Sequence, residues 1–339
     1  MDLTTKVFDQ LRKELENGDY PEGSRFPSEI ILADRFSVNR VTINKAVARL
    51  VQAGYLARGI RGAGTRVISS TVFPRGYIAY VGGSSIYALR ILAGIQQEAL
   101  YAGYVAIVIA PPLEEISNFV RQLSKANICG IITAQCGFIS PPTDLPLIYV
   151  DYNQAISLPG SRTVNSDNYT GGLQLMREIL NRGHREIAVY ATEHRAFSNQ
   201  KKYAARVKGF CEAMNEFGIE NADERIFAGT PNSISDAKRI LTKIYNQIPN
   251  CSIIATDSDL NANALRLAAA QMSMPLPTLT GFGNISDYPM ASVEQHPEDL
   301  GAYACRYLLE IIENRRDPTA PLHEFFAAQP VKLEYIPQR

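Results

Sequence analysis

The chain has 339 residues, with 34 basic and 34 acidic side chains and 46% apolar residues, a composition typical of soluble globular proteins. No apolar run approaches the roughly 20 residues that span a membrane. The N-terminus lacks the basic and apolar regions of a secretory signal, so we expect a cytoplasmic protein. This length exceeds one ordinary core and predicts two or three folding units.

The cysteines and histidines argue against disulfides and metal sites. The five cysteines are scattered and form no CxxC pair, which favours reduced thiols in the cytosol. The four histidines show no metal-ligand spacing. We therefore expect no metal, no cofactor and no catalytic residue. The cysteines are Cys129, Cys136, Cys211, Cys251 and Cys305.

The first part of the chain is predicted to be a small helical unit. Apolar residues at helical spacing predict a first helix over residues 4–16. Ser28 is expected to cap a second helix that ends at Phe36, with Ile31, Leu32 and Phe36 on its apolar stripe. A short break leads into a third helix, Arg40–Gln52. Two short helices joined by a tight turn form a helix-turn-helix unit.

The third helix has an apolar and a polar face. The predicted core face consists of Ile43, Ala46, Val47 and Leu50. The other face suits a major groove, because Asn can read adenine, Arg can read guanine, and Val or Ala can touch thymine methyl groups. An ordinary solvated face is the alternative. The polar face carries Arg40, Val41, Thr42, Asn44, Lys45 and Ala48.

Two short strands, Tyr55–Arg58 and Thr65–Ile68, are predicted to flank a glycine-rich loop. The loop does not have the GxGxxG spacing and no helix follows it, which excludes a dinucleotide fingerprint. Between Phe36 and Ser70 every charged residue is basic, which favours contact with phosphates over an ordinary basic surface. These residues are Arg40, Lys45, Arg49, Arg58, Arg61 and Arg66.

With these motifs in register, the segment Phe26 to Val67 resembles the DNA-binding domain of GntR-type bacterial repressors. The matching motifs include Pro27-Ser28-Glu29, Val38-Asn39-Arg40-Val41-Thr42-Ile43 and Gly62-Ala63-Gly64-Thr65. The family usually has Arg where Ile30 and Asn44 stand, which indicates a different operator sequence. The residues expected to contact double-stranded operator DNA are Ser28, Arg40, Thr42, Asn44, Lys45, Arg61, Gly62 and Gly64.

After a short, polar and basic segment, Ser69–Arg75, apolar strands alternate with helical stretches. This order favours an α/β domain with parallel sheets. We expect a winged helix-turn-helix domain over residues 1–70, a linker over 71–76 and a two-lobed domain over 77–339. Strands are predicted at Tyr77–Val81, Val105–Ile109, Gly130–Thr133, Leu147–Val150, Ile187–Tyr190, Ser252–Ala255 and Leu279–Gly281. Helices are predicted at Tyr87–Ala102, Ile116–Lys125, Gly171–Arg182, Ala204–Glu216, Ile234–Tyr245, Asn261–Ala270 and Pro297–Asn314.

Three motifs in this part of the chain carry a second resemblance. They are Val164-Asn165-Ser166-Asp167-Asn168, Arg206-Val207-Lys208-Gly209-Phe210 and Leu279-Thr280-Gly281-Phe282-Gly283-Asn284. In this order they resemble the LacI-type sensor domain, which is related to periplasmic sugar-binding proteins. The fusion of the two parts resembles bacterial arabinose repressors. We therefore expect a homodimer that binds operator DNA and a small polar effector, such as a sugar.

The resemblance implies an effector site between the two lobes. The family position of Arg206 donates to ligand hydroxyls or carboxylates, and Asp167 lies in the cleft. The alternatives are an exposed helix charge for Arg206, an N-cap for Asp167 and helix capping for the serines. The expected effector-binding residues are Ser84, Ser85, Tyr87, Asp167, Arg206, Asp257 and Asn284.

Two departures from the family concern this site. The family usually has Asp where Gly283 stands and an aromatic residue where Pro231 stands. The pocket is therefore open to an effector other than a simple pentose or hexose. Asn284 or Asn232 could supply replacement polar groups.

A doubly wound enzyme with an accessory DNA-binding head is the alternative function. It would need an acid-base pair or a phosphate-binding loop, and the sequence has neither. Gly82-Gly83-Ser84-Ser85 is not a nucleophile elbow, and His184 lies in a helix-to-strand turn with no nucleophile beside it. A transport protein of the same fold would need a secretion signal.

Overall fold

The structure is a computed structural model. It describes residues 3–59, 64–68, 73–110, 115–123, 127–134, 145–152, 155–156, 158–192 and 200–339. The chain divides into two compact units, Met1–Gly76 with Gly103–Val105, and Tyr77–Ala102 with Ala106–Arg339. Within the described ranges no helix is both long and apolar enough to cross a membrane. Cys129, Cys211, Cys251 and Cys305 are free thiols, and Cys136 lies outside the described residues.

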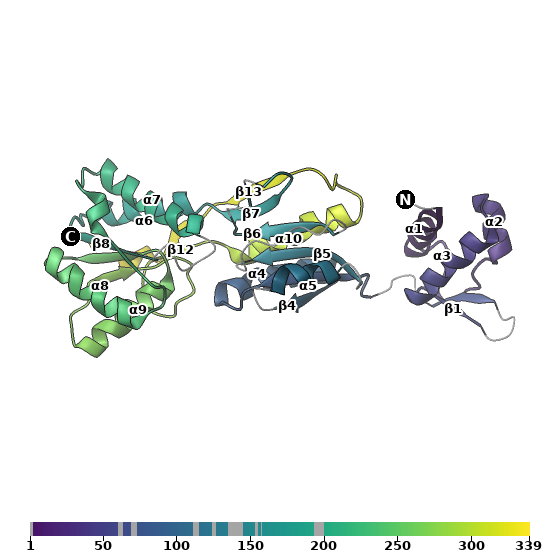
Figure 1. Cartoon of the computed structure of the whole chain (residues 1–339), viewed down its shortest axis with the longest axis horizontal. Coiled ribbons are helices and arrows are strands. Elements are labelled where there is room, and N and C mark those ends of the chain that lie inside the picture. Colours follow the sequence, from purple (N-terminus) through teal and green to yellow (C-terminus); the bar gives the residue numbers. More distant parts are fainter. Residues whose placement is uncertain are drawn as a thin grey trace. The chain divides into compact units, whose positions relative to one another are not determined.

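The first unit is a helix-turn-helix followed by a two-stranded hairpin (Figure 1). Ser28 caps the second helix by accepting the N–H of Ile31 at 3.4 Å, as predicted, and Asn39 caps the third by accepting the N–H of Val41 at 2.9 Å. The strands β1 and β2 pair antiparallel. The elements are α1 (Leu3–Glu16), α2 (Glu29–Phe36), α3 (Arg40–Gln52), β1 (Leu56–Arg58) and β2 (Thr65–Val67).

The core of this unit forms where one face of each helix meets the hairpin. The predicted core face of α3 is confirmed, because its four apolar residues are at most 1% exposed. The prediction for Ile31 is wrong, since its side chain is 59% exposed. The prediction for Leu32 is confirmed, because its side chain is fully buried, and one step along a helix turns a side chain by about 100°.

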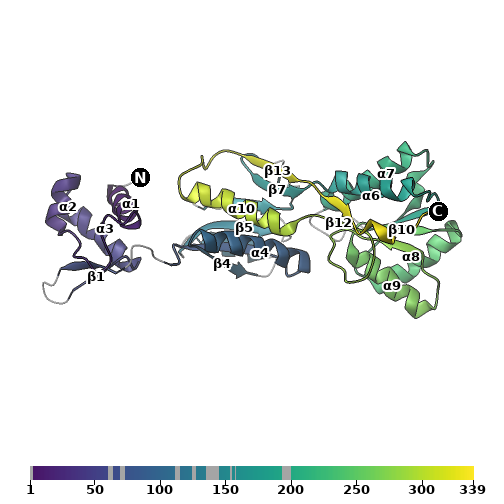
Figure 2. The ribbon, with the colours of Figure 1, turned by 180° about the vertical axis from the view of Figure 1, so that it is seen from behind.

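The second unit has two lobes, each built on a sheet. The sheet of the first lobe has the order β13-β7-β6-β5-β3-β4, and its central strands run parallel. Helix α5 packs on one face of the sheet, while α4 and α10 pack together on the other (Figure 2). The elements are β3 (Tyr77–Gly82), α4 (Ile86–Tyr101), β4 (Val105–Ile109), α5 (Ile116–Leu123), β5 (Ile128–Ala134), β6 (Leu147–Val150), β7 (Arg162–Ser166), α10 (Pro297–Ile312) and β13 (Leu322–Phe326).

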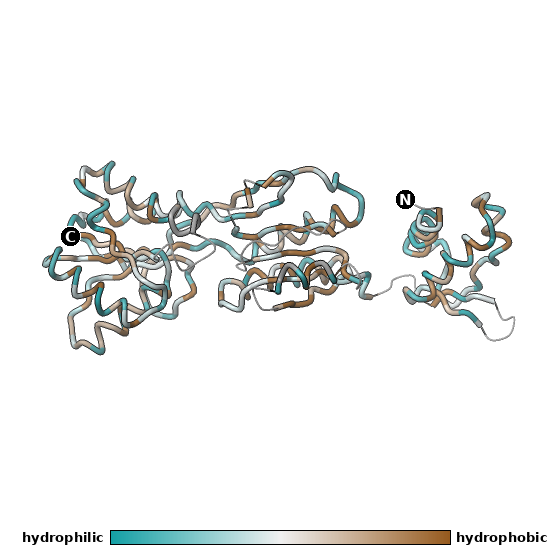
Figure 3. The backbone as a smooth tube through the Cα atoms, in the orientation of Figure 1, coloured by the Kyte–Doolittle hydropathy of each residue, from teal (hydrophilic) through white to brown (hydrophobic). Residues whose placement is uncertain are grey.

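The second lobe has a parallel sheet with the order β11-β10-β8-β9 and helices on both faces. Along β8, Ile187 and Val189 pack under α6 and α7, whereas Ala188 and Tyr190 pack under α8 and α9. Burial on both faces explains why the central strands are apolar along their length (Figure 3). The elements are α6 (Asn168–Asn181), β8 (Ile187–Thr192), α7 (Gln200–Glu216), β9 (Ile226–Gly229), α8 (Ile234–Gln247), β10 (Ile253–Thr256), α9 (Asp259–Met272) and β11 (Thr278–Thr280).

Three crossover segments join the two lobes. The first leads from β7 into α6, the second from β12 (Ser292–Glu294) into α10, and the third from β13 into β14 (Gln329–Val331). The strands β12 and β14 pair antiparallel, which holds the second and third crossovers side by side. The crossovers lie beyond the carboxyl ends of the sheet strands, where ligands bind in folds of this class.

Candidate functional site

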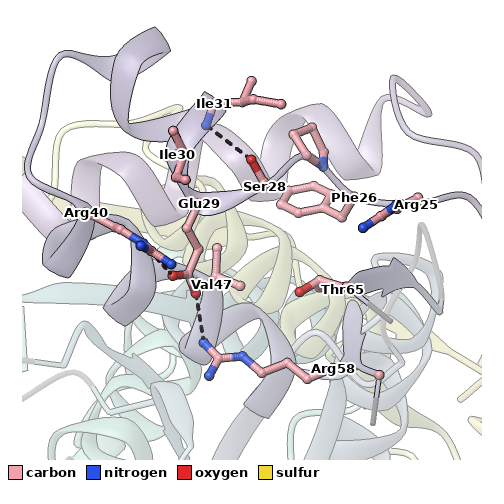
Figure 4. A pocket seen from close by; sticks show the side chains of 13 residues that line it. Arg25, Phe26, Ser28, Glu29, Ile30, Ile31, Arg40, Val47, Arg58 and Thr65 are labelled. Carbon is pink, nitrogen blue, oxygen red and sulfur yellow. Dashed lines mark hydrogen bonds and ion pairs between the residues drawn. The ribbon is translucent and has the colours of Figure 1, made fainter. Parts of the chain in front are cut away.

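The surface of the first unit has a hollow of about 690 Å³ between α2, α3 and the hairpin (Figure 4). The N-terminus of α2 opens into it, and a helix N-terminus attracts phosphate groups through its unpaired N–H groups. Among the described residues, three arginine side chains line the same hollow. The residues around it include Arg25, Ser28, Glu29, Ile30, Arg40 and Arg58.

Glu29, at the start of α2, contacts three side chains from other elements. Its carboxylate lies 3.6 Å from Nε of Arg40 and 3.4 Å from Nη2 of Arg58, and it accepts a hydrogen bond from Nδ2 of Asn44 at 2.7 Å. Solvent-exposed pairs of this kind contribute little to stability. They do fix side-chain directions on the surface. No role for Glu29 was predicted from the sequence, although it belongs to the motif Pro27-Ser28-Glu29.

The other expected DNA-binding residues occupy different positions. Lys45 is exposed, and Thr42 is half-buried. Gly64 has a φ of 78°, and a Cβ there would lie 2.9 Å from Nε of Arg25, so glycine suits the position. Arg61 and Gly62 lie outside the described residues.

One residue of the predicted basic patch faces elsewhere. The guanidinium of Arg49 lies 4.2 Å from the ring centroid of Phe8, and its Nη1 donates to Oγ1 of Thr5 at 3.1 Å. Both partners belong to α1. Arg49 therefore joins α3 to α1, although its side chain stays exposed.

In the second unit, Arg206 on α7 is the centre of a buried polar network. Its Nε donates to Oδ1 of Asn168 at 2.8 Å, and its Nη1 donates to the backbone oxygen of Asp257 at 2.7 Å. Its Nη2 donates to Oε1 of Gln295 at 3.1 Å, and the guanidinium lies 4.0 Å from the ring centroid of Phe282. Arg206 is only 3% exposed, so the alternative of an exposed helix charge is wrong.

Two partners of Arg206 lie in the crossover segments. Asn168 begins α6 directly after the first crossover, and Gln295 follows β12 in the second. The two side chains also meet each other, since Nε2 of Gln295 donates to Oδ1 of Asn168 at 3.1 Å. Arg206 therefore ties the second lobe to two of its connections with the first. Neither partner was predicted from the sequence, although Asn168 stands next to Asp167 in the motif Val164-Asn165-Ser166-Asp167-Asn168.

Asp257 is fully buried beside this network. Its Oδ2 accepts the N–H of Thr192 at 2.7 Å, and its Oδ1 accepts from Nδ2 of Asn261 at 2.8 Å. Burial raises the pKa of the Asp257 carboxyl, although the hydrogen bonds from Thr192 and Asn261 and the charge of Arg206 act in the opposite direction. The Asp257 carboxylate thus accepts hydrogen bonds from two neighbours within the second lobe, Thr192 and Asn261.

The first lobe contributes Tyr87, from the first turn of α4. It is 5% exposed, and its hydroxyl lies 3.2 Å from Oγ of Ser166. Burial, followed by the charge of Asp151, raises the pKa of Tyr87, while the charge of Arg206 lowers it. The charges of Asp151 and Arg206 thus shift the pKa of Tyr87 in opposite directions. Asp151 directly follows β6 and is fully buried, and it was not predicted as a site residue.

The capping alternatives hold for two expected effector residues. Ser85 caps α4 and Asp167 caps α6, each by accepting the backbone N–H three residues later, at 3.1 and 3.0 Å. Ser84 is exposed beside Ser85. These positions have structural roles, which do not prevent contact with a ligand.

At one of the two positions that depart from the family, the backbone conformation favours glycine. Gly283 has a φ of 116°, a conformation that residues with a side chain rarely adopt, so Asp would be strained there. The next residue, Asn284, donates through Nδ2 to Oε2 of Glu294 at 2.8 Å. Asn232 donates its backbone N–H to Oδ1 of Asn261 at 3.1 Å, so it braces the lobe.

The two described units thus consist of a winged helix-turn-helix and a two-lobed, periplasmic-binding-protein-like domain, the architecture of a transcription regulator. Residues 84–323 match the family described as periplasmic binding proteins and sugar binding domain of LacI family. The chain belongs to this family. Residues 3–67 match the bacterial regulatory proteins of the gntR family, so the DNA-binding head is of the GntR type.

Similar proteins include several regulators. The HTH-type transcriptional repressor PurR of Klebsiella pneumoniae is 22% identical over 248 residues, which cover 68% of this chain and 71% of that protein. A solved complex of the transcriptional regulator CelR with cellobiose has a TM-score of 0.64 at 16% identity, covering 90% of this chain and 98% of that one. The transcription regulator GntR from Chromobacterium violaceum has a TM-score of 0.60 at 18% identity, with coverages of 75% and 97%.

Proposed function

We propose that this chain is a repressor whose affinity for operator DNA changes when a small polar effector binds between its lobes. The observation that carries the proposal is the Arg206 network. It joins the second lobe to two crossovers, so a ligand at this place would favour one lobe arrangement over another. We propose a regulator and not an enzyme, because the families matched are regulatory and binding proteins. An operator-binding protein would act in the cytoplasm.

For the DNA-binding part we propose residues 1–70, with a linker over 71–76 and the effector-binding domain over 77–339. The exposed guanidinium groups of Arg40 and Arg58 around the hollow support DNA contact, as does the exposed Lys45. The proposed contacts keep the full set of residues expected from the sequence, from Ser28 to the wing glycines.

For the effector we propose a site beyond the carboxyl ends of the strands, formed by Tyr87, Arg206 and Asp257. The structure adds Asp151 and Gln295 as neighbours of these groups. The site offers hydroxyl, carboxylate and amide groups, which suits a ligand with several hydrogen-bonding groups. Because CelR was solved with cellobiose, sugars are the first compounds to test.

We also propose a homodimer that forms through the first lobe. Along α4, Ile86, Leu89 and Leu100 are 51–57% exposed and recur on one side of the helix. Val108, on the edge strand β4, is 55% exposed as well. Exposed apolar surface of this kind marks an interaction site, and two-fold symmetric dimers are the commonest assembly.

The test uses the full-length protein and a library of random duplexes. We expect selection to enrich one inverted repeat. A thermal-shift screen against sugars, sugar phosphates and nucleosides should then find a compound that raises the melting temperature. That compound should change affinity for the repeat by about 5- to 150-fold. If no duplex is enriched, the proposed function is wrong, and chemical turnover of the stabilising compound would favour the enzyme instead.

A further inference from the structure

The side-chain amide of Asn44 is held in one orientation. It lies on the outward face of α3, and its Nδ2 donates to Oε1 of Glu29 at 2.7 Å. An ionised carboxylate only accepts hydrogen bonds, so the amino group and not the carbonyl of Asn44 must face Glu29. The carboxylate is itself held, because Arg40 and Arg58 contact it from two other elements.

This orientation suits one base. Adenine presents an acceptor at N7 and a donor at N6 in the major groove, whereas guanine presents two acceptors. One hydrogen of Nδ2 is directed to Glu29, the second is available for adenine N7, and Oδ1 of Asn44 can accept from adenine N6. A guanine would set its O6 against Oδ1. If Asn44 were free to rotate, its amide would discriminate less well.

A neighbouring side chain fits the same base pair. Val41 stands one turn before Asn44 on the outward face of α3 and is 60% exposed. An apolar side chain at this place matches the methyl group of thymine, which is the partner of adenine. Both residues therefore favour an A·T pair under the start of α3.

We propose that Glu29 is a positioning residue that fixes the amide of Asn44, and that Asn44 then selects adenine at one position of each operator half-site. This inference rests on the proposed DNA-binding function. The proposed function requires only a basic surface that binds DNA. The inference adds a preference for adenine and names Glu29 as the residue that sets it.

The first test compares full-length wild type and Asn44→Ala on the duplex that wild type selects. We expect wild type to prefer adenine at one position of each half-site by about tenfold. Replacing that adenine by 7-deazaadenine, which lacks N7, should weaken wild-type binding several-fold and leave Asn44→Ala binding unchanged. An unchanged preference at every position in Asn44→Ala would overturn the proposal.

The second test concerns Glu29, with Asp34→Asn as a matched control. Both Glu29→Gln and Asp34→Asn remove one negative charge from α2, and Asp34 is exposed near the other end of that helix. We expect Glu29→Gln to lose most of the discrimination between adenine and guanine, because its amide can accept as well as donate. Asp34→Asn should keep the discrimination. Equal discrimination by the two variants would overturn the role of Glu29, whereas a wild type that enriches no duplex contradicts the proposed function itself.

Discussion

At the scale of single residues, Arg40 and Arg49 are two arginines of one helix with opposite surroundings. Arg40 is 65% exposed beside Glu29, whereas Arg49 packs on Phe8 of α1. We expect Arg40→Ala to weaken operator binding by about 1–3 kcal/mol, because it removes a contact to DNA. Arg49→Ala removes the same charge and should weaken binding less. Gel shifts at one fixed salt concentration measure both, and equal losses would remove Arg40 from the interface.

Arg206 has a structural consequence as well as a proposed effector role. Its replacement by Ala removes the Arg206 donor from Oε1 of Gln295 and from the backbone oxygen of Asp257, and it leaves Oδ1 of Asn168 with Nε2 of Gln295 as its donor. We expect Arg206→Ala to lower the free energy of unfolding by about 3 kcal/mol or more and to abolish the response to effector. The control is Arg177→Ala, which breaks an exposed pair with Glu216 and should change the stability little. Urea unfolding gives the free energy of unfolding of each variant. A value for Arg206→Ala close to that of the control would contradict a stabilising role for the Arg206 network.

His184 predicts a pH dependence of stability. It is fully buried between Oγ of Ser252 and the backbone oxygen of Pro337, at 2.8 and 3.0 Å. Burial, together with the charges of Arg339 and Arg182, lowers the pKa of His184 below its usual value of about 6.5. As the pH falls below about 6.5, His184 of the unfolded chain binds a proton that the folded chain does not bind, so the free energy of unfolding decreases.

We therefore expect the difference in unfolding free energy between wild type and His184→Asn to shrink as the pH falls from about 7.5 to about 5.5. Denaturant unfolding at the two pH values gives this difference directly. The variant has no titratable group at this position. Because both proteins share all other titratable groups, their contributions cancel in the difference. A difference that grows at low pH would mean that the histidine is charged when folded.

At the scale of elements, α4 carries the predicted dimer contact. We expect Leu89→Glu to place a charge in that contact and convert the dimer into a monomer at micromolar concentration, with weaker operator binding. The control is Lys243→Glu on the exposed side of α8, which should leave the assembly unchanged. Sedimentation velocity reads out both variants, and a dimeric Leu89→Glu would exclude this helix.

The elements differ in how far their own residues specify them. The helix α3 and the strands β4 and β6 were predicted at their observed bounds, because long apolar periodicity or a compact apolar run marks them. The strands β7, β9, β12, β13 and β14 were not predicted. The strand β7, for example, carries polar residues that are buried only because β6 and β13 pair with it on either side.

At the scale of the whole molecule, the proposed function links two binding events. If an effector changes operator affinity by some factor, the operator must change effector affinity by the same factor. We expect titrations of the full-length protein with each ligand, in the presence and absence of the other, to give equal ratios. Unequal ratios at equilibrium would mean that the effector also binds at a second place, such as the DNA-binding surface.

The sequence alone determined the two-part organisation, the α/β class, the cap of α2 and the basic character of the segment from Phe36 to Ser70. These properties depend on local periodicity, on turn residues and on motifs in register. Only the tertiary structure decided which polar side chains meet. Arg206, Asn168 and Gln295 come from distant segments, as do Asn44, Glu29 and Arg58. The cause is that a buried or held polar group needs a partner at hydrogen-bond distance, and only packing fixes which partner that is.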